Sequence, residues 1–301
     1  MTIGIGIALG FVRPDTHQIE IAINPAIAAL LFVTFLGVPF AELARGFRDV
    51  RFLAALLVLN FVVVPVVAFG LSRFVAHHDA LLLGVLLVLL TPCIDYVIVF
   101  AAAAGGAHER LLAAAPLLMV LQLLLLPLYL LIIAGPTATE SVEPGPFVEA
   151  LVLLILIPLG AAALTQWVAR RTRAVAVMST RAQHAMVPLM MAVLFIVVAS
   201  QTPKIASDPQ PLASLVPIYV AFLAIMAILG VVTARVAQLD APRGRALVFS
   251  GATRNSLVVL PLALALPVDL RLAAAVIVTQ TLVELLAMPV YVRLVPRLLP
   301  V

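Results

Sequence analysis

The stretch Thr91-Pro92-Cys93-Ile94-Asp95 interrupts an otherwise apolar segment that runs from about Leu81 to Ala104. It joins a residue that breaks helices, the single cysteine of the chain and a carboxylate. In hydrocarbon, the peptide groups freed by a broken helix, and any charged side chain, must be satisfied by protein or by water in a cavity. The stretch therefore predicts a functional site within a membrane span, at Asp95 and its neighbours.

The composition is typical of a polytopic membrane protein. Of the 301 residues, 64% are hydrophobic and 11% are charged, and the mean hydropathy is +1.24. A soluble core of this size could not hide so much apolar surface. One cysteine excludes an internal disulfide framework and a multi-cysteine metal cage within one subunit. The basic residues behind the net charge of +4 fall in short loops, so the expected partner is the lipid bilayer and no nucleic acid.

Hydropathy predicts an all-α fold. A span needs roughly 20 mostly apolar residues. The opening stretch, Thr2 to Val12, is too short, and we count it as a partial first span in a frame of ten. Nine full spans are predicted at about 22–43, 51–74, 81–104, 111–134, 147–169, 184–202, 212–234, 244–266 and 271–293.

The basic residues predict how the chain is oriented. Of the 18 lysines and arginines, Arg254 lies within a predicted span, and Arg13, Arg73, Lys204 and Arg271 fall on one side of the membrane. All the others fall on the opposite side, which the positive-inside rule makes cytoplasmic. We therefore expect a multi-pass protein of the cell membrane, plasma or inner, with a cytoplasmic C-terminus.

A self-comparison predicts an internal repeat with a displacement of 162 residues. We divide the chain into a first five-helix repeat at 1–134, an external linker at 135–146 and a second five-helix repeat at 147–301. Because five is an odd number of spans, the second repeat is inverted. Inverted repeats with a broken helix in each half are typical of secondary transporters, whose site lies where the breaks meet. The matched pairs are Pro92 with Arg254, Cys93 with Asn255, Gln122 with Glu284, Pro127 with Pro289 and Tyr129 with Tyr291.

The second break is Gly251-Ala252-Thr253-Arg254-Asn255-Ser256. Half-helix ends at such breaks present unpaired amides and carbonyls with partial charges, where a small polar or charged substrate can bind. We therefore expect the substrate-binding residues at the two breaks and on the last span. They are Cys93, Asp95, Arg254, Asn255, Ser256 and Glu284, with secondary positions at Pro92, Thr253, Gln122 and Gln280.

Asp95, Arg254 and Glu284 are the formally charged residues deep in the predicted spans. A charge at the bilayer centre costs from about 3 to more than 10 kcal/mol, so pairing or protonation is expected. In one interpretation Arg254 forms a structural ion pair with Asp95 or Glu284. In the other, one carboxylate pairs with Arg254 and the second binds and releases protons. The two interpretations do not exclude each other.

Cys93 has two interpretations as well. A lone buried cysteine usually behaves as a small hydrophobe, but a thiol at a break could bind a soft electrophile such as trivalent arsenic or antimony. No histidine has metal-ligand spacing with Cys93, so we expect no metal site and no cofactor. The chain has no zinc-ligand helix motif and no serine or aspartate dyad in facing spans, so we do not expect an enzyme. We interpret Asn60 and Gln166 as residues that hydrogen-bond between helices.

The chain resembles the arsenical-resistance permeases, the arsenite-efflux family within the bile acid/arsenite/riboflavin transporter superfamily. The resemblance rests on Cys93-Ile94 with Val97 in the fourth span, Asn255 at the ninth-span break and Leu282-Val283-Glu284 in the tenth. It implies a bile acid symporter-like fold with interleaved panel and core domains and two crossed broken helices. It also implies that Cys93 and Glu284 serve the efflux of arsenite or antimonite against the entry of protons.

Two features depart from that family. Asp95-Tyr96 stands where the family has apolar residues, and Arg254 occupies the ninth-span break. The related bile acid symporters hold sodium ions near this crossing. A guanidinium there would repel sodium and cannot deprotonate, which argues against sodium coupling.

The leading functional prediction is a secondary active transporter that couples protons, carried by Glu284 or Asp95, to efflux of arsenite, antimonite or a similar small oxyacid. The alternative is a sodium- or proton-coupled symporter of an organic anion, such as a bile-acid-like compound, whose carboxylate pairs with Arg254. A third possibility is a membrane receptor or scaffold that keeps the fold and needs no proton-titrating group at the midplane.

Overall fold

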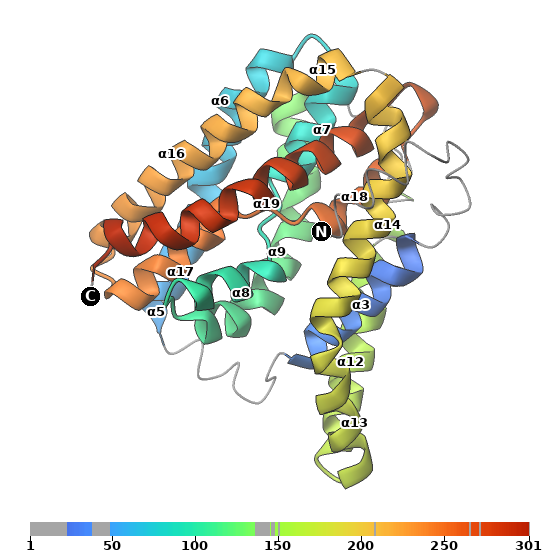
Figure 1. Ribbon diagram of the computed structural model, residues 1–301, viewed down its shortest axis with the longest axis vertical. Coiled ribbons are helices and arrows are strands. Elements are labelled where there is room, and N and C mark those ends of the chain that lie inside the picture. The colour runs from blue at the N-terminus through green and yellow to red at the C-terminus, as the bar shows by residue number, and fades with distance from the viewer. Residues whose placement is uncertain are drawn as a thin grey trace.

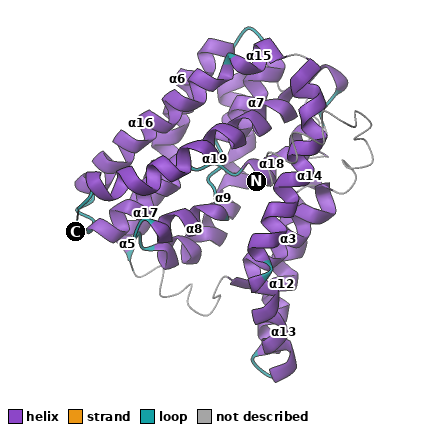
Figure 2. Cartoon of the chain, in the orientation of Figure 1, coloured by secondary structure: helices purple, strands orange, loops and turns teal. Residues whose placement is uncertain are grey.

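The structure is a computed structural model that describes residues 23–37, 49–135, 145, 148–149, 151–207, 209–264, 266–270 and 272–300. Within these residues the chain forms helices joined by loops, without strands (Figure 2). The expected all-α class is therefore confirmed for the described part. The predicted partial first span at 2–12 and nearly all of the predicted linker at 135–146 lie outside the described residues.

The first half of the chain supplies one continuous long helix, two short helices around a break, and a second long helix. The long Val50–Val75 helix contains a π-helical turn, η1, and ends in a 3-10 turn, η2. The elements are α3 (Ile23–Gly37), α5 (Val50–Val58), η1 (Leu59–Val63), α6 (Val64–Ser72), η2 (Arg73–Val75), α7 (Asp79–Leu89), α8 (Tyr96–Ala103) and α9 (His108–Ala134).

After η3 and the helices α12 to α15, the second half shows the same order of a long helix, two short helices around a break, and a second long helix. The elements are η3 (Leu151–Leu156), α12 (Ile157–Ala169), α13 (Arg173–His184), α14 (Met186–Ser207), α15 (Pro209–Ala213), α16 (Leu215–Val236), α17 (Ala241–Ala252), α18 (Ser256–Leu264), η4 (Val268–Leu270) and α19 (Leu272–Leu298).

The helices do not match the nine predicted full spans one for one. Among the described residues, four helices are long and apolar enough to cross a membrane, Val50–Val75, His108–Ala134, Gln210–Val236 and Leu272–Leu298. A fifth span would join Arg173–His184 to Pro188–Val197 across a bend of 47°. By length and composition, the described part of the chain thus contains four or five candidate membrane spans, and the count of nine stays a prediction.

The differences have local causes. The predicted spans 81–104 and 244–266 are each divided into two short helices, α7 with α8 and α17 with α18, because each contains a break. The segment between 169 and 184, which we expected to be an arginine-rich loop, contains the polar helix α13. Its basic residues did not prevent a helix, because arginine is a good helix former.

The helices pack into two groups (Figure 1). The larger group comprises α5 to α9 and α16 to α19, in which α19 packs on α7 and α16 packs on α17. The smaller group comprises α3, α12, α13 and α14, and it lies at the lower right of the figure. The groups meet where α14 contacts α19 and α3 contacts α18. Each group therefore takes helices from both predicted halves.

Charged residues gather where α5, α9 and α17 begin. Asp49 accepts a hydrogen bond from the Phe52 N–H at 3.2 Å and caps α5, and Asp240 caps α17 in the same way. Asp49 also forms ion pairs with Arg110 and Arg243. The hydrogen bond from the Arg243 side chain lowers the pKa of Asp240, so this cap is ionised at neutral pH. The three helices are therefore held together at one end of the larger group.

The opposite end of the larger group carries Arg73. Its guanidinium donates to the carbonyl oxygen of Ile133 at 3.0 Å, near the end of α9. Arg110 lies at the start of α9 and Arg73 lies beside its end, as their assignment to loops on opposite sides of the membrane predicts. Which end faces the cytoplasm stays a prediction.

Gly84 permits α7 to pack closely on α19. A Cβ at this position would lie 2.7 Å from Cβ of Val276 and 3.0 Å from Cα of Ala273. Real Cβ atoms essentially never approach so closely, so any side chain at residue 84 would push the two helices apart. Because α7 leads directly into the first break, this contact helps to fix the position of the break.

We expect Gly84→Ala to lower the stability of the protein by about 1–3 kcal/mol, because overpacking strains the contact between α7 and α19. The control is Gly70→Ala on α6, where a Cβ meets nothing within 4 Å. That change should leave stability unchanged or raise it by up to about 1 kcal/mol through helix propensity. Thermal unfolding of the purified protein in detergent measures both, and equal melting temperatures would contradict the close contact.

Candidate functional site

The two breaks lie against each other and share their main-chain hydrogen bonds. The N–H of Cys93 donates to the carbonyl oxygen of Thr253 at 3.1 Å, and the N–H of Asn255 donates to the carbonyl oxygen of Thr91 at 2.8 Å. Peptide groups that a broken helix leaves unpaired must find partners inside the protein when the break lies in a membrane. Each break supplies those partners to the other.

The crossing has a local two-fold relation. Pro92 and Arg254, which face each other in an antiparallel bridge, are 162 positions apart. The same shift of 162 positions relates Cys93 to Asn255 and Thr91 to Thr253, so the two main-chain hydrogen bonds of the crossing are equivalent. It also relates two side-chain bonds, from the hydroxyls of Thr91 and Thr253 to carbonyl oxygens four residues earlier, at 3.0 and 2.8 Å. This is the arrangement that the predicted displacement requires at the crossing, while a repeat of the whole halves stays a prediction.

Glu284 on α19 ties the last helix to both breaks. It is fully buried, and its Oε2 accepts hydrogen bonds from the main-chain N–H of Arg254 at 2.9 Å and from the Gln280 side chain at 2.5 Å. Its Oε1 accepts a bond from the Tyr96 hydroxyl at 2.7 Å. The same hydroxyl lies 3.0 Å from the carbonyl oxygen of Arg254. Sequence reasoning did not select Tyr96, although a polar side chain directly after Asp95 was a signal.

The side chain of Arg254 turns away from Glu284. Its Nη2 donates to Oδ1 of Asn60 at 3.0 Å and to the carbonyl oxygens of Ser250 and Gly251 at 2.6 and 2.8 Å. Its Nη1 donates to the carbonyl oxygen of Leu89 at 3.2 Å. The guanidinium is therefore held by neutral oxygens from three elements, η1, α17 and α7.

The predicted ion pair of Arg254 does not form. Within the described residues, no ion pair joins its guanidinium to Asp95 or to Glu284. Glu284 instead binds the main chain of Arg254. The sequence placed the three charges in spans that were expected to meet at the site, but it could not specify which way each side chain turns.

Asn60 has a larger role than the interhelical hydrogen bond that we expected. Its Nδ2 donates to the carbonyl oxygen of Leu56 and to the hydroxyl of Ser250, both at 3.0 Å. These two bonds direct its Oδ1 toward Arg254. Asn60 lies in η1, and π-helical turns inside longer helices are frequent at functional sites.

Asp95 is the carboxylate of the crossing that lacks hydrogen bonds. It is 1% exposed, and neither of its oxygens has a hydrogen-bond partner within the described residues. It faces the hydroxyl of Thr34 on α3, which is also buried, but the two groups are not in hydrogen-bonding geometry. Asp95 therefore lies between the larger group of helices and the smaller one.

Cys93 lies in the break, three residues before α8, and its buried sulfur faces the backbone amides of Asp95 and Val97. The side-chain oxygen of Asn255 accepts the N–H of Val258 at 3.3 Å in the first turn of α18. Ser256 is buried beside it, and its hydroxyl is unpaired in the part of the chain that the structure describes. All the predicted binding residues at the two breaks are thus buried in this conformation.

A small cavity borders the second break. Its volume is about 10 Å³, close to that of a single water probe. Ser256 and Thr281 supply its hydroxyls, and Val197 of α14 closes it from the smaller group. The cavity therefore lies at the contact between the two groups.

Gln122 does not join the crossing through any hydrogen bond of the described residues. It is buried in α9, and both atoms of its amide lack a partner there. Gln280, the other secondary residue on a span, binds Glu284. Of the secondary positions, Pro92, Thr253 and Gln280 therefore lie at the site, while the part of Gln122 stays a prediction.

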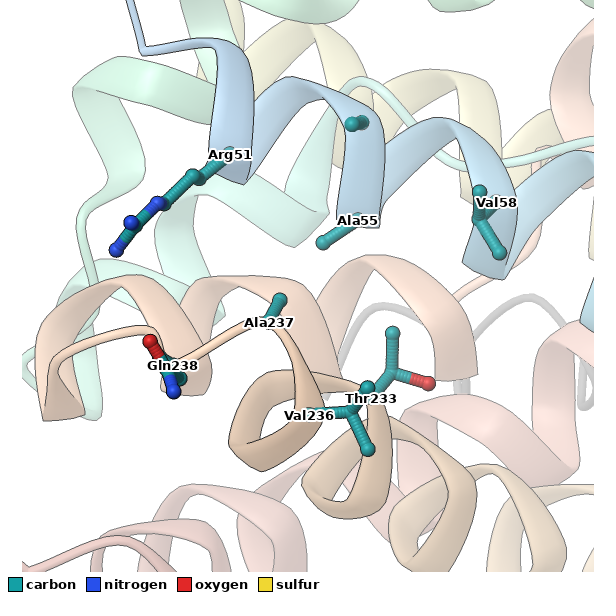
Figure 3. Close-up of a pocket in the computed structure, with 8 residues that line it drawn as sticks. Arg51, Ala55, Val58, Thr233, Val236, Ala237 and Gln238 are labelled. Carbon is teal, nitrogen blue, oxygen red and sulfur yellow. The ribbon is translucent and has the colours of Figure 1, made fainter.

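A larger groove lies outside the crossing, between α5 and the end of α16 (Figure 3). Its volume is about 440 Å³, and Arg51 and Gln238 lie at one end of an otherwise mostly apolar lining. None of the predicted site residues lines it. Among the described residues, no group of three histidine, cysteine, aspartate or glutamate side chains is arranged to hold a metal ion.

A model of the SBF-like CPA transporter family matches residues 1–292 of the chain. This range includes both breaks and the whole of the Glu284 contact network. No curated protein matches the chain.

We expect Tyr96→Phe to lower stability by about 1–2 kcal/mol, because it removes a buried hydrogen bond to Glu284. The control is Tyr219→Phe, which removes a buried 3.1 Å bond from α16 to the carbonyl oxygen of Val276 on α19, a bond in which no residue of the predicted site takes part. Both variants should melt at lower temperature than the parent. Solute transport should fall only in Tyr96→Phe, and equal transport by the two variants would show that the Tyr96 bond has no part in the site.

Proposed function

The chain belongs to the SBF-like CPA transporter family, and we propose that it is a secondary transporter that carries a small solute by alternating access between its two groups of helices. The observation that supports this most is Asp95, a buried carboxylate at the contact between the crossing and α3 whose oxygens have no hydrogen-bond partner among the described residues. A structural carboxylate would be expected to have partners, since an unpaired buried charge is costly. Intramembrane carboxylates of this kind typically belong to ion or proton pathways.

Protons are the proposed driving ion, and Asp95 is their proposed carrier. A carboxylate sealed from water without donors is favoured in its neutral form, and it can release the proton when the two groups of helices separate and water enters. Glu284 already has three donors, and two of them, the Tyr96 hydroxyl and the main-chain N–H of Arg254, link α19 to the two breaks. Moving a proton there would require these bonds to rearrange, so we assign Glu284 a positioning role.

Arsenite or antimonite is the proposed substrate, with Cys93 as its ligand. The thiol lies two residues from Asp95 in the break that precedes α8, and soft thiol ligands suit trivalent arsenic. The thiol can replace one hydroxyl of arsenous acid, with water as the leaving product, and the reverse step frees the substrate. One such bond suits a protein that must release its cargo.

The alternative of an organic-anion symporter is less well supported. It requires Arg254 to pair with a substrate carboxylate, but the guanidinium is wholly buried and donates to four protein oxygens. A substrate would have to displace them. A non-transporting receptor would leave the unpaired state of Asp95 without an explanation.

Arsenite uptake by everted membrane vesicles tests the proposal. With an imposed proton gradient, vesicles that contain the parent protein should accumulate arsenite, and those with Cys93→Ala or Asp95→Asn should fall to near background, because each loses a ligand or the proton carrier. The matched control is Asp269→Asn, which changes an exposed carboxylate in η4 and should transport normally.

Three outcomes would contradict the proposal. Normal arsenite transport by Cys93→Ala would remove the thiol from the mechanism. Normal proton-driven transport by Asp95→Asn, together with failure of Glu284→Gln, would show that the proton carrier is Glu284 and not Asp95. Uptake of an organic anion that requires Arg254, without arsenite uptake, would favour the alternative substrate.

A further inference from the structure

The guanidinium of Arg254 is enclosed in a cage of neutral oxygens. The side chain is 0% exposed, and it is the largest fully buried side chain in the described structure. Four oxygens accept its hydrogen bonds at 2.6 to 3.2 Å, and none of them belongs to a carboxylate. Hydrogen bonds of a charged donor to such oxygens are stronger than neutral ones, which helps to offset the cost of burying the charge.

Three of the four oxygens are main-chain carbonyls at helix ends. Leu89 is the last residue of α7, while Ser250 and Gly251 lie in the last turn of α17. Carbonyls in the last turn of a helix lack intrahelical partners and carry the partial negative charge of the helix dipole. The C-terminal ends of two half-helices therefore converge on one positive charge.

Asn60 completes the cage from the Val50–Val75 helix. The bonds of its Nδ2 to Leu56 and Ser250 leave its oxygen as the atom that faces the guanidinium. The guanidinium also lies over the ring of Phe222 on α16, with the ring centroid 5.5 Å from Cζ of Arg254. The groups that make these contacts with the charge are oxygens and an aromatic face, which are groups that bind monovalent cations, while Nε of Arg254 has no acceptor in the part of the chain that the structure describes.

The position of the backbone at residue 254 allows its side chain to reach the four oxygens. The main-chain N–H of Arg254 binds Glu284, which holds the backbone at the crossing. The side chain then reaches back along its own helix to the carbonyl oxygens three and four residues earlier. A cation delivered in this way is covalently attached and cannot diffuse out of the cage.

We propose that these oxygens form a binding site for a monovalent cation, and that Arg254 fills this site permanently with a cation of the chain itself. The guanidinium neither leaves nor deprotonates, so the cage does not exchange sodium or potassium during transport. Arg254 thereby determines that the protein needs no dissolved metal cation at its crossing. The expected result for transport rests on the proposed function, whereas the expected results for stability rest only on the contacts of Arg254.

The test empties the cage and offers a cation to it. Arg254→Ala vacates the space of the guanidinium and should lower the melting temperature of the purified protein. Dilute guanidinium chloride should then restore stability with rising concentration, as mass action requires, by about 3 °C or more. Tetramethylammonium chloride at equal ionic strength is too bulky for the cage and should have no such effect.

Arg254→Met is the matched control. Its side chain is apolar and occupies most of the space, so it should be destabilised without any response to guanidinium. Equal responses of Arg254→Ala and Arg254→Met would overturn the proposal, because the ion would then act elsewhere.

The parent protein provides a measurement that does not depend on whether the variants fold. Its melting temperature, and its proton-driven uptake in vesicles, should be the same in sodium and in choline buffers. A sodium requirement in either would overturn the proposal. Because the melting measurements need no transported solute, a wrong substrate assignment and a wrong assignment of Arg254 give different results.

Discussion

The structure depends on the mutual hydrogen bonding of its two helix breaks. A membrane interior offers no water to a free peptide group, so a single break in one span would be costly. Here the carbonyl oxygens of Thr91 and Thr253 each receive an N–H from the opposite break. The two interrupted helices can therefore exist only as a pair. The close packing at Gly84 and the bonds to Glu284 hold that pair against α19.

The charges at the crossing are arranged around this pair. Arg254 divides its contacts, because its main chain binds Glu284 while its side chain satisfies carbonyls at the ends of α7 and α17. Tyr96 and Gln280 complete the shell of Glu284. Asp95 is left without a donor among the described residues. One arginine thus serves structure at the crossing, and one carboxylate is available for the exchange of protons that we propose.

The position of Asp95 connects this local chemistry to the two groups of helices. It faces Thr34 of α3, so any separation of the smaller group from the larger one changes the surroundings of the carboxylate directly. The small cavity beside Ser256 lies at the same contact. Membership of a transporter family is consistent with a site that two rigid groups open and close in turn.

The sequence by itself determined the membrane class, the places of both breaks and the displacement that brings Pro92 opposite Arg254, because hydropathy, prolines and polar residues in apolar runs are local features. The division of helices into two groups, and the length of each helix around a break, followed from packing. Only the tertiary structure decided that Arg254 turns toward Asn60 and not toward a carboxylate. The physical reason is that a side chain takes the nearest acceptors in space, and those acceptors are carbonyls of helix ends that no single segment reveals.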